Sequence, residues 1–201
     1  MRRIITISAR YGAGGSIVGP DVADALGFPF FDRAVPQAGV PGVDGEGAPL
    51  DERTGGLWVR VLEAFAQMPA DPSSGMLTVG NDAALRSSAE EQLRQFAAGE
   101  QGVVLGWASA VVIADGYHVR LDGPPDARLH QAMAIDGDLT EVEARRQLKD
   151  TDRIRSLYWR RLYGREFTDM DPYHLVVDST AVDLATVTQL ITTGARAFWS
   201  R

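Results

Sequence analysis

The chain has 201 residues, enough for one ordinary domain with a real core, and its 45% hydrophobic and 23% charged content is typical of globular proteins. It contains no cysteine, which excludes disulfides and thiolate metal sites, and its net charge of −7 argues against a general nucleic-acid binder. No apolar run is long enough for a signal peptide or a membrane span, so we expect a cytoplasmic protein without nucleic-acid or membrane partners.

The first predicted element is a strand over residues 4–8, which leads into the glycine-rich sequence Gly12-Ala13-Gly14-Gly15. An amphipathic segment then predicts a helix over residues 17–26, with Gly27 as its C-cap. A strand, a glycine loop and a helix in this order present backbone N–H groups to a phosphate at the helix N-terminus. The loop is therefore either a phosphate site or a plain glycine-rich turn.

The loop departs from both common glycine fingerprints. A P-loop reads G-x-x-x-x-G-K-[ST]. With Gly14 as its second glycine, Ala9 stands at the first glycine and Gly15 at the lysine, while Ser16 keeps the hydroxyl that binds the metal ion. The lysine that reaches the β- and γ-phosphates is therefore absent. The dinucleotide fingerprint G-x-G-x-x-G fails because residue 17 is isoleucine.

The rest of the chain alternates predicted strands and helices, which indicates an α/β fold with a parallel sheet. Residues 36–56 contain nine Gly or Pro residues and predict a flexible loop. A capping box at Thr140 to Glu143 opens a long helical stretch that extends to about Tyr163. The other predicted elements are strands over 28–31, 103–105, 118–121 and 175–177, and helices over 57–68, 82–98, 125–133 and 182–199.

Basic residues are concentrated in one stretch of this acidic chain. Residues 145–165 carry eight basic and two acidic side chains, a net charge of +6, which leaves −13 for the remainder. Arginine forks suit phosphate oxygens. The stretch is therefore a phosphate-binding helix, a solvated charged face, or a docking surface for an acidic partner.

Five segments, taken in order, resemble the cytidylate kinase-like family, a branch of the P-loop nucleoside monophosphate kinases. In that branch the position of the P-loop lysine is often glycine. The segments are the first strand and loop at 4–16, GFPFFDR at 27–33, HVRL at 118–121 followed by DAR at 126–128, KDTDRIR at 149–155, and YHLVVDST at 173–180.

The resemblance implies a fold and an activity. The fold is a three-layer α/β P-loop kinase fold with a parallel sheet, a helical insertion and an arginine-rich lid, all in one domain over residues 1–201. The activity is phosphoryl transfer from ATP to a nucleoside monophosphate, CMP by family, with Mg²⁺ as cofactor and nucleotides as small-molecule partners. The alternative is a non-catalytic nucleotide-binding protein that kept the fold and lost turnover. The implied parts are a core (1–33, 101–135 and 167–201), a monophosphate-side insertion (34–100) and the lid (136–166).

The resemblance also implies roles for individual residues. Lys149, Arg153 and Arg155 would stabilise the transferring phosphoryl group, and Ser16 would hold the metal ion. The donor nucleotide would lie against Arg10, Gly12, Ala13, Gly14, Gly15 and Ser16, with Asp178, Ser179 and Thr180 on the base side, and the acceptor would lie against Asp32, Arg33 and Arg128.

Several of these residues have a structural alternative. Arg10 is either a cation that supplies charge in place of the lysine or a surface arginine at a strand end. Asp32 either orients the monophosphate or the metal ion, or it caps a strand and pairs with Arg33. Residues 178–180 either line a base pocket or cap the last helix. We expect Asp152 to pair with an arginine of the lid.

After the missing lysine of the P-loop pattern, a second departure, this one from the family pattern itself, lies after the predicted strand 103–105. The family has an arginine after the glycine at this point, where it contacts the monophosphate, whereas this chain has Gly106-Trp107. A tryptophan cannot bind phosphate with two hydrogen bonds. Trp107 either stacks on a base or fills the core.

Overall fold

The computed structural model describes residues 2–32, 86–87, 90–91, 93–106 and 108–201. Five strands form a single sheet in which every neighbouring pair is parallel, as predicted. In chain order the strands are β1 (Arg3–Ala9), β2 (Phe30–Asp32), β3 (Gln101–Leu105), β4 (Tyr117–Asp122) and β5 (Leu175–Asp178). Their order across the sheet is β2-β3-β1-β4-β5, so that the first strand lies at the centre.

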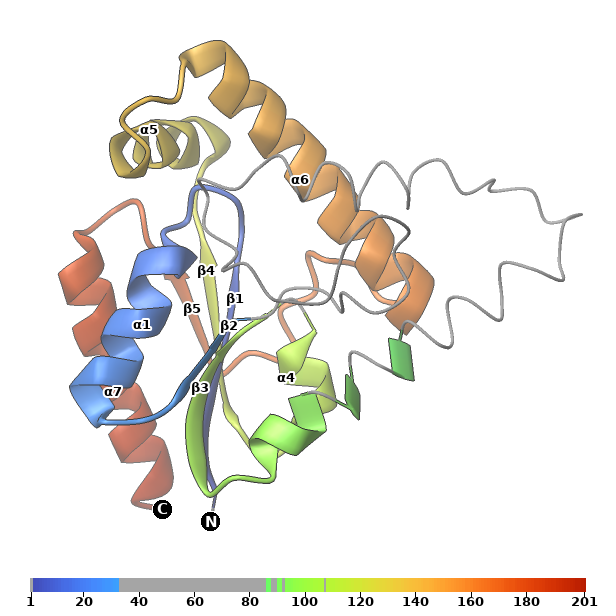
Figure 1. Ribbon diagram of the computed structural model, residues 1–201, viewed down its shortest axis with the longest axis vertical. Helices are drawn as coiled ribbons and strands as arrows, with labels where there is room; N and C mark the ends of the chain where they lie inside the picture. Colours follow the sequence, from blue (N-terminus) through green and yellow to red (C-terminus); the bar gives the residue numbers. More distant parts are fainter. Residues whose placement is uncertain (1, 33–85, 88–89, 92, 107) are drawn as a thin grey trace, which may run out of the picture.

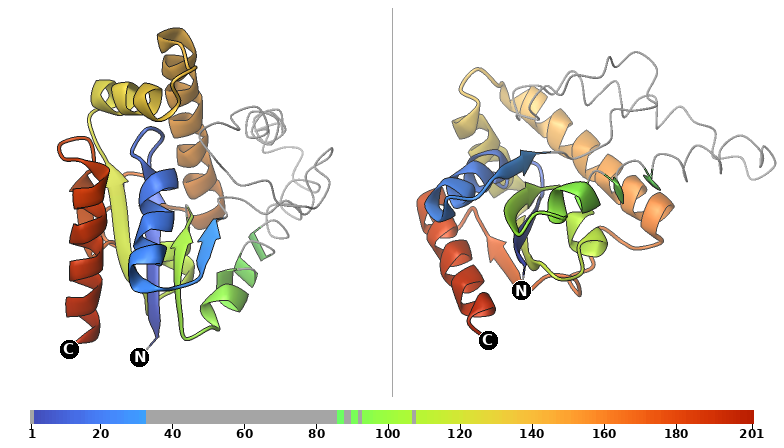
Figure 2. Two further views of the ribbon diagram at one scale, coloured as in Figure 1. Left: turned by 60° about the vertical axis from the view of Figure 1, so that its left-hand side comes forward. Right: turned by 60° about the horizontal axis from the view of Figure 1, so that its bottom comes forward.

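Helices cover both faces of this sheet and give three layers (Figure 1). They are α1 (Gly15–Leu26), α4 (Ser109–Val112), α5 (Pro125–Ile135), α6 (Glu141–Tyr163) and α7 (Leu184–Trp199). Helices α1 and α7 lie side by side on one face, and α4 lies on the other (Figures 1 and 2). Helix α5 and the start of α6 lie beyond the carboxyl ends of the strands. Within the described ranges, no helix combines the length and the apolar character that a membrane crossing requires.

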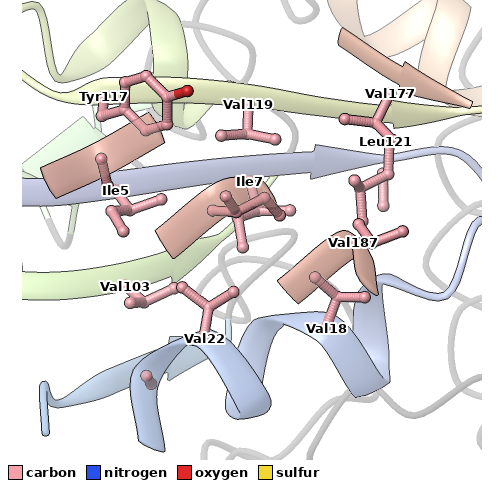
Figure 3. Close-up of a cluster of buried hydrophobic side chains, with 14 of the residues drawn as sticks. Ile5, Ile7, Val18, Val22, Val103, Tyr117, Val119, Leu121, Val177 and Val187 are labelled. Carbon is pink, nitrogen blue, oxygen red and sulfur yellow. The ribbon is translucent and has the colours of Figure 1, made fainter. Parts of the chain in front are cut away.

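The central strand is buried on both faces, as expected for a parallel strand between two helical layers. Its residues 4–9 are all buried. Ile5 and Ile7 pack with Val18 of α1 and Val187 of α7 in the larger core cluster (Figure 3). On the opposite face, Ile4 belongs to a smaller cluster that also contains Leu93, Ala97, Val104 and Ile113.

The helix ends follow the local signals in the sequence. Helix α1 begins at Gly15, two residues before the predicted start, and ends at Gly27, whose φ of +66° and N–H bonds to the preceding turn make it the predicted C-cap. Thr140 and Glu143 form the predicted capping box at the start of α6. These three boundaries are set by residues close to them in sequence.

The later elements differ from the sequence analysis in two respects: one of its alternatives is excluded, and one helix has no counterpart in it. The last helix begins at Leu184, and its N-cap is Asp183, whose carboxylate accepts from the N–H of Thr186 at 2.8 Å. Residues 178–180 therefore do not cap it. Helix α4 was not predicted, because four small and apolar residues are too few to show a helical period. The predicted loop at 36–56, the predicted helix at 57–68, Arg33 and Trp107 lie outside the described residues.

Candidate functional site

The glycine loop, defined here as Arg10–Ser16, follows the carboxyl end of the central strand. From β1 the chain crosses to β2 at one side, and from β3 it crosses back over β1 to β4 at the other. The strand order therefore reverses at β1. In parallel α/β sheets, ligands bind beyond the carboxyl ends of the strands at such a reversal.

Glycine is required at two positions of the loop. Gly12 and Gly14 have φ values of +74° and +73°, which L side chains rarely adopt. A Cβ at Gly12 would lie 2.1 Å from the carbonyl oxygen of Arg128, and one at Gly14 would lie 2.7 Å from Cδ2 of Leu184. The backbone of Arg128 and the side chain of Leu184 thus pack directly against the loop, which leaves no room for a side chain at Gly12 or Gly14.

Side chains from distant segments hold the carbonyl oxygens of the loop. Within the loop, the oxygens of Arg10 and Gly14 accept from backbone N–H groups of the turn and of the first turn of α1. The oxygens between and before them accept from side chains. The donors are Arg155 to Ala9 O, Arg128 Nη1 to Tyr11 O at 2.8 Å, Gln131 Nε2 to Gly12 O at 3.0 Å, and Ser179 Oγ to Ala13 O at 2.8 Å.

Four N–H groups of the loop, unlike its carbonyl groups, have no hydrogen-bond partner among the described residues. Among the described residues, the N–H groups of Gly12, Gly14, Gly15 and Ser16 donate to no acceptor. Helix α1 has no side-chain cap and no acidic residue in its first turn. Buried N–H groups without partners are rare in folded proteins. The carbonyl groups of the loop already accept hydrogen bonds, whereas these N–H groups remain free to donate. Successive free N–H groups at a helix N-terminus form an anion-binding site, which the helix dipole strengthens.

The hydroxyl of Ser16 has the properties that a metal ligand needs. Its Oγ is buried and has no hydrogen-bond partner in the described part of the chain. Over those same residues no group of three or more His, Asp or Glu side chains could hold a metal ion by itself. Mg²⁺ commonly binds through one or two protein oxygens and the phosphates of a substrate. The residues therefore fit a magnesium ion that arrives with a polyphosphate.

The sequence predicts that Arg128 contacts the acceptor. In the structure its side chain is buried and donates a hydrogen bond to the backbone of the glycine loop. Its side chain is fully buried, and besides the bond to Tyr11 O it donates to Gly123 O at 3.0 Å and to Asp152 Oδ2 at 2.8 Å. Asp152 also lies 3.6 Å from Arg10. The expectation that Asp152 pairs with an arginine of the lid is wrong, because its ion-pair partners within the described residues come from α5 and from the glycine loop.

A second buried arginine with a carboxylate partner at this edge was not predicted from the sequence. Arg120 is fully buried in β4, where it donates to Asp122 Oδ2 at 3.2 Å and to Phe167 O at 2.8 Å. Its guanidinium also lies 4.2 Å from the ring centroid of Phe167. The available signal was an arginine between the apolar residues Val119 and Leu121 of a strand, because a buried charge requires a partner.

The predicted catalytic residues fall into two groups. Lys149 and Arg153 are exposed on α6, and within the described residues neither has an ion-pair or hydrogen-bond partner. Arg155 is half-buried and donates to Ala9 O at the start of the loop. The hydroxyl of Tyr11 donates to Gln147 Oε1 at 2.7 Å, which also joins the loop to α6. Helix α6 thus carries two exposed cations, Lys149 and Arg153, and its residues Gln147 and Arg155 connect it to the loop and to the strand before it.

The residues predicted to lie on the base side, 178–180, differ in their burial and in their hydrogen-bond partners. Ser179 is fully buried and belongs to the support of the loop. The carboxylate of Asp178 accepts from the N–H of Thr180 at 3.0 Å and from its hydroxyl at 2.6 Å, and Asp178 is exposed. Asp32 ends β2 at the carboxyl edge of the sheet, on the far side of β3 from the loop.

Known proteins give a consistent comparison. The family model described as "Cytidylate kinase-like family" matches residues 4–181. An uncharacterized protein from Eubacterium ventriosum ATCC 27560 superposes with a TM-score of 0.64 at 18% identity, covering 96% of this chain and 98% of the other. A gluconokinase from Sinorhizobium meliloti 1021 gives a TM-score of 0.53 at 17% identity, covering 98% and 95%. Among curated proteins, no sequence matches.

The structural similarities show the P-loop kinase-like α/β fold, with its five-stranded parallel sheet. The family match adds a relationship that extends over most of the chain, from the first strand to the segment that follows the last one. It includes the glycine loop, both buried arginines with their carboxylate partners, and the basic helix. The resemblance read from the sequence is thereby confirmed, and the chain belongs to the cytidylate kinase-like family.

Proposed function

We propose that this protein transfers a phosphoryl group from ATP to a nucleoside monophosphate, with CMP as the acceptor that the family suggests. The observation that carries the proposal is the hydrogen bonding of the glycine loop. Side chains hold its carbonyl groups, and the N–H groups of Gly12, Gly14, Gly15 and Ser16 have no acceptor within the described residues. Phosphate oxygens are suitable acceptors for such N–H groups at a helix N-terminus.

In this proposal the loop binds the donor phosphates. The free N–H groups fix their position, and the hydroxyl of Ser16 holds the magnesium ion that accompanies them. The ion, when bound, neutralises charge on the phosphates during transfer. The protein has little covalent chemistry to perform, because phosphoryl transfer depends on positioning and charge stabilisation.

The basic residues of α6 would act on the group in transfer. Lys149 and Arg153 are exposed cations without partners in the described part of the chain, so they are free to meet phosphate oxygens. Arg155 is fixed at the loop and would act beside the donor. In the domain organisation that the family suggests, residues 136–166 are the lid, residues 34–100 carry the acceptor side, and Asp32 and Arg33 contact the monophosphate.

The second candidate is a nucleotide-binding protein without turnover. The observation in its favour is Gly15, which leaves the loop without the lysine of the P-loop pattern. This candidate keeps the same phosphate nest and requires no acceptor site. It therefore predicts binding of ATP and no release of ADP.

The experiment is an ADP-release assay with Mg²⁺-ATP and each nucleoside monophosphate in turn, with nucleotide binding measured by calorimetry on the same preparation. We expect turnover that is highest with CMP. Ser16→Ala should lose most of the turnover, whereas Ser200→Ala, at an exposed hydroxyl after α7, should not. ATP binding without turnover would favour the second candidate, and no nucleotide binding at all would contradict both.

A further inference from the structure

Gly15 has no room for a side chain. A Cβ built at this residue would lie 2.6 Å from the Cβ of Ala9 and 3.2 Å from Cδ1 of Leu105. The exclusion is steric, because φ of Gly15 is not positive. The Cβ of Ala9 is fixed by the backbone at the end of β1 and cannot rotate away. Any residue other than glycine at position 15 must therefore displace the strand or the helix.

Ala9 and Gly15 stand at the first glycine and the lysine of the P-loop pattern. The two departures from the pattern are therefore one packing arrangement. The methyl group of Ala9 occupies the space that a side chain at position 15 would need. A lysine at position 15 requires glycine at position 9, so a single substitution cannot restore the pattern.

Arg10, between these two residues in sequence, has a guanidinium that is held in place without hydrogen bonds. Its Nε lies 3.3 Å from Asp122 Oδ2, and its Nη1 lies 3.6 Å from Asp152 Oδ2. Its Cζ lies 5.5 Å from the ring centroid of Phe167. Nε is buried, and across the described part of the chain no N–H of this group has a hydrogen-bond acceptor. Because Nε is buried beside Asp122, the donors available to a ligand are the N–H groups on Nη1 and Nη2.

Within the described residues, arginines outnumber carboxylates in the ion pairs beside the loop. Three guanidinium groups, those of Arg10, Arg120 and Arg128, share the two carboxylates of Asp122 and Asp152. Arg120 and Arg128 are fully buried and donate to protein acceptors. The side chain of Arg10 keeps 21% of its surface exposed. Arg10 is thus the cation of this cluster that is both reachable and without hydrogen bonds.

We propose that Arg10 supplies to a bound polyphosphate the positive charge that the lysine supplies in the P-loop pattern, and that Ala9 is the reason for the exchange. This inference rests on the proposed function and assigns a residue within that same site. Asp122, Asp152 and Phe167 hold the guanidinium in place, and the phosphate oxygens accept from it in two hydrogen bonds. Arg10 is a binding residue in this account, and Ala9 acts through packing.

The test is the affinity of tripolyphosphate and of ATP for the full chain, measured by calorimetry. Arg10→Gln should weaken both about 10- to 100-fold, the usual effect of losing a hydrogen-bonded charge. The matched control is Arg3→Gln, which removes the same charge from the exposed, opposite end of β1. It should bind like the wild type. Equal affinities in the two variants would overturn the assignment of Arg10, whereas a wild type that binds neither probe would overturn the proposed function itself.

Rescue tests the link between Arg10 and the packing of Ala9. In the Arg10→Gln background, Ala9→Gly together with Gly15→Lys should regain at least tenfold in affinity for tripolyphosphate, and Gly15→Lys alone should regain nothing. Thermal melts of the wild-type background provide the steric comparison. Gly15→Ala should lower the Tm, and Ala9→Gly with Gly15→Ala should recover it. A Gly15→Ala variant as stable as the wild type would overturn the packing argument.

The wild-type chain provides a test that does not depend on the folding of Arg10→Gln. The Nε–H signal of Arg10 in a nitrogen–proton NMR spectrum is identified by its absence in Arg10→Lys. Tripolyphosphate should shift this signal together with the amide signals of Gly14 and Gly15. Movement of the glycine signals with a constant Arg10 signal would overturn the assignment.

Discussion

The hydroxyl of Ser179 donates to the carbonyl oxygen of Ala13 at 2.8 Å and joins the segment after β5 to the glycine loop. Ser179 is fully buried, and its hydroxyl also lies 3.2 Å from the carbonyl oxygen of Asp122. One side chain thus connects the ends of the first, fourth and fifth strands. The shape of the candidate phosphate site depends on this connection.

Ser179→Ala should destabilise the fold by about 1–3 kcal/mol, because the carbonyl oxygen of Ala13 loses its donor, whereas that of Asp122 keeps the backbone N–H of Ser179. ATP affinity should fall as well, since the loop loses one of its supports. Urea unfolding and calorimetry measure the two effects. Ser200→Ala, which removes an exposed hydroxyl, is the control and should change neither. A Ser179→Ala variant as stable as the control would show that the loop holds its shape without this bond.

Arg128→Met should lower the free energy of unfolding by about 1–3 kcal/mol, the range for a buried acceptor that is left without its donor. The change removes donors to Tyr11 O, Gly123 O and Asp152. The control is Arg145→Met, because the Arg145 side chain is 58% exposed and its ion-pair partners in the described ranges, Asp126 and Glu141, are exposed carboxylates. Surface pairs of that kind contribute about 0–1 kcal/mol. Similar urea midpoints for both variants would contradict a supporting role for Arg128.

Arg153→Ala and Arg155→Ala should behave differently, although both residues are predicted to stabilise the transferring group. Arg153 is exposed, so its variant should melt like the wild type and lose turnover, by roughly 10³-fold if it contacts the phosphoryl group. Arg155 also bonds to Ala9 O, so its variant should lose both Tm and turnover. Thermal melts and the ADP-release assay separate the two effects. Normal turnover in both variants would exclude a catalytic role for this part of α6.

Stability should fall as the pH is lowered from about 6.5 to about 4, because of a buried histidine in β4. Burial lowers the pKa of His118 to about 4, and the nearby His174 acts in the same direction. His118 Nδ1 lies 2.8 Å from Thr6 Oγ1. The unfolded chain binds a proton near pH 6.5 and the folded chain does not, so stability is complete above that pH and is lost as the pH falls toward 4.

The loss over this range should be about 3 kcal/mol at most, from a shift of about 2.5 pKa units. Urea unfolding at pH 7.5 and at pH 4.5 measures it. His118→Gln should reduce the dependence on pH, whereas His130→Gln, at an exposed position, should leave it as in the wild type. An unchanged slope in His118→Gln would assign the effect to other groups.

The features that follow from nearby residues could be predicted from the sequence. The parallel strands, the capping box of Thr140 and Glu143, and the C-cap at Gly27 each depend on a pattern within a few positions. The partners of Asp152 could not be predicted, because Arg10 and Arg128 reach it only after the sheet has formed. The resemblance to the family indicates which residues to consider at the site. The structure shows which of them hydrogen-bond to the glycine loop or to the strand before it, and which are exposed.

The support of the loop depends on residues that are far away in sequence. Arg128, Gln131, Arg155 and Ser179 lie 117, 119, 146 and 166 residues beyond the carbonyl groups that they hold. Contacts of such high sequence separation form late in folding, because long chain loops must close first. During synthesis the glycine loop leaves the ribosome well before the segment that contains Ser179, yet it acquires its shape only after the fifth strand has docked. A nascent chain that ends before Ser179 would contain the complete loop sequence without the site.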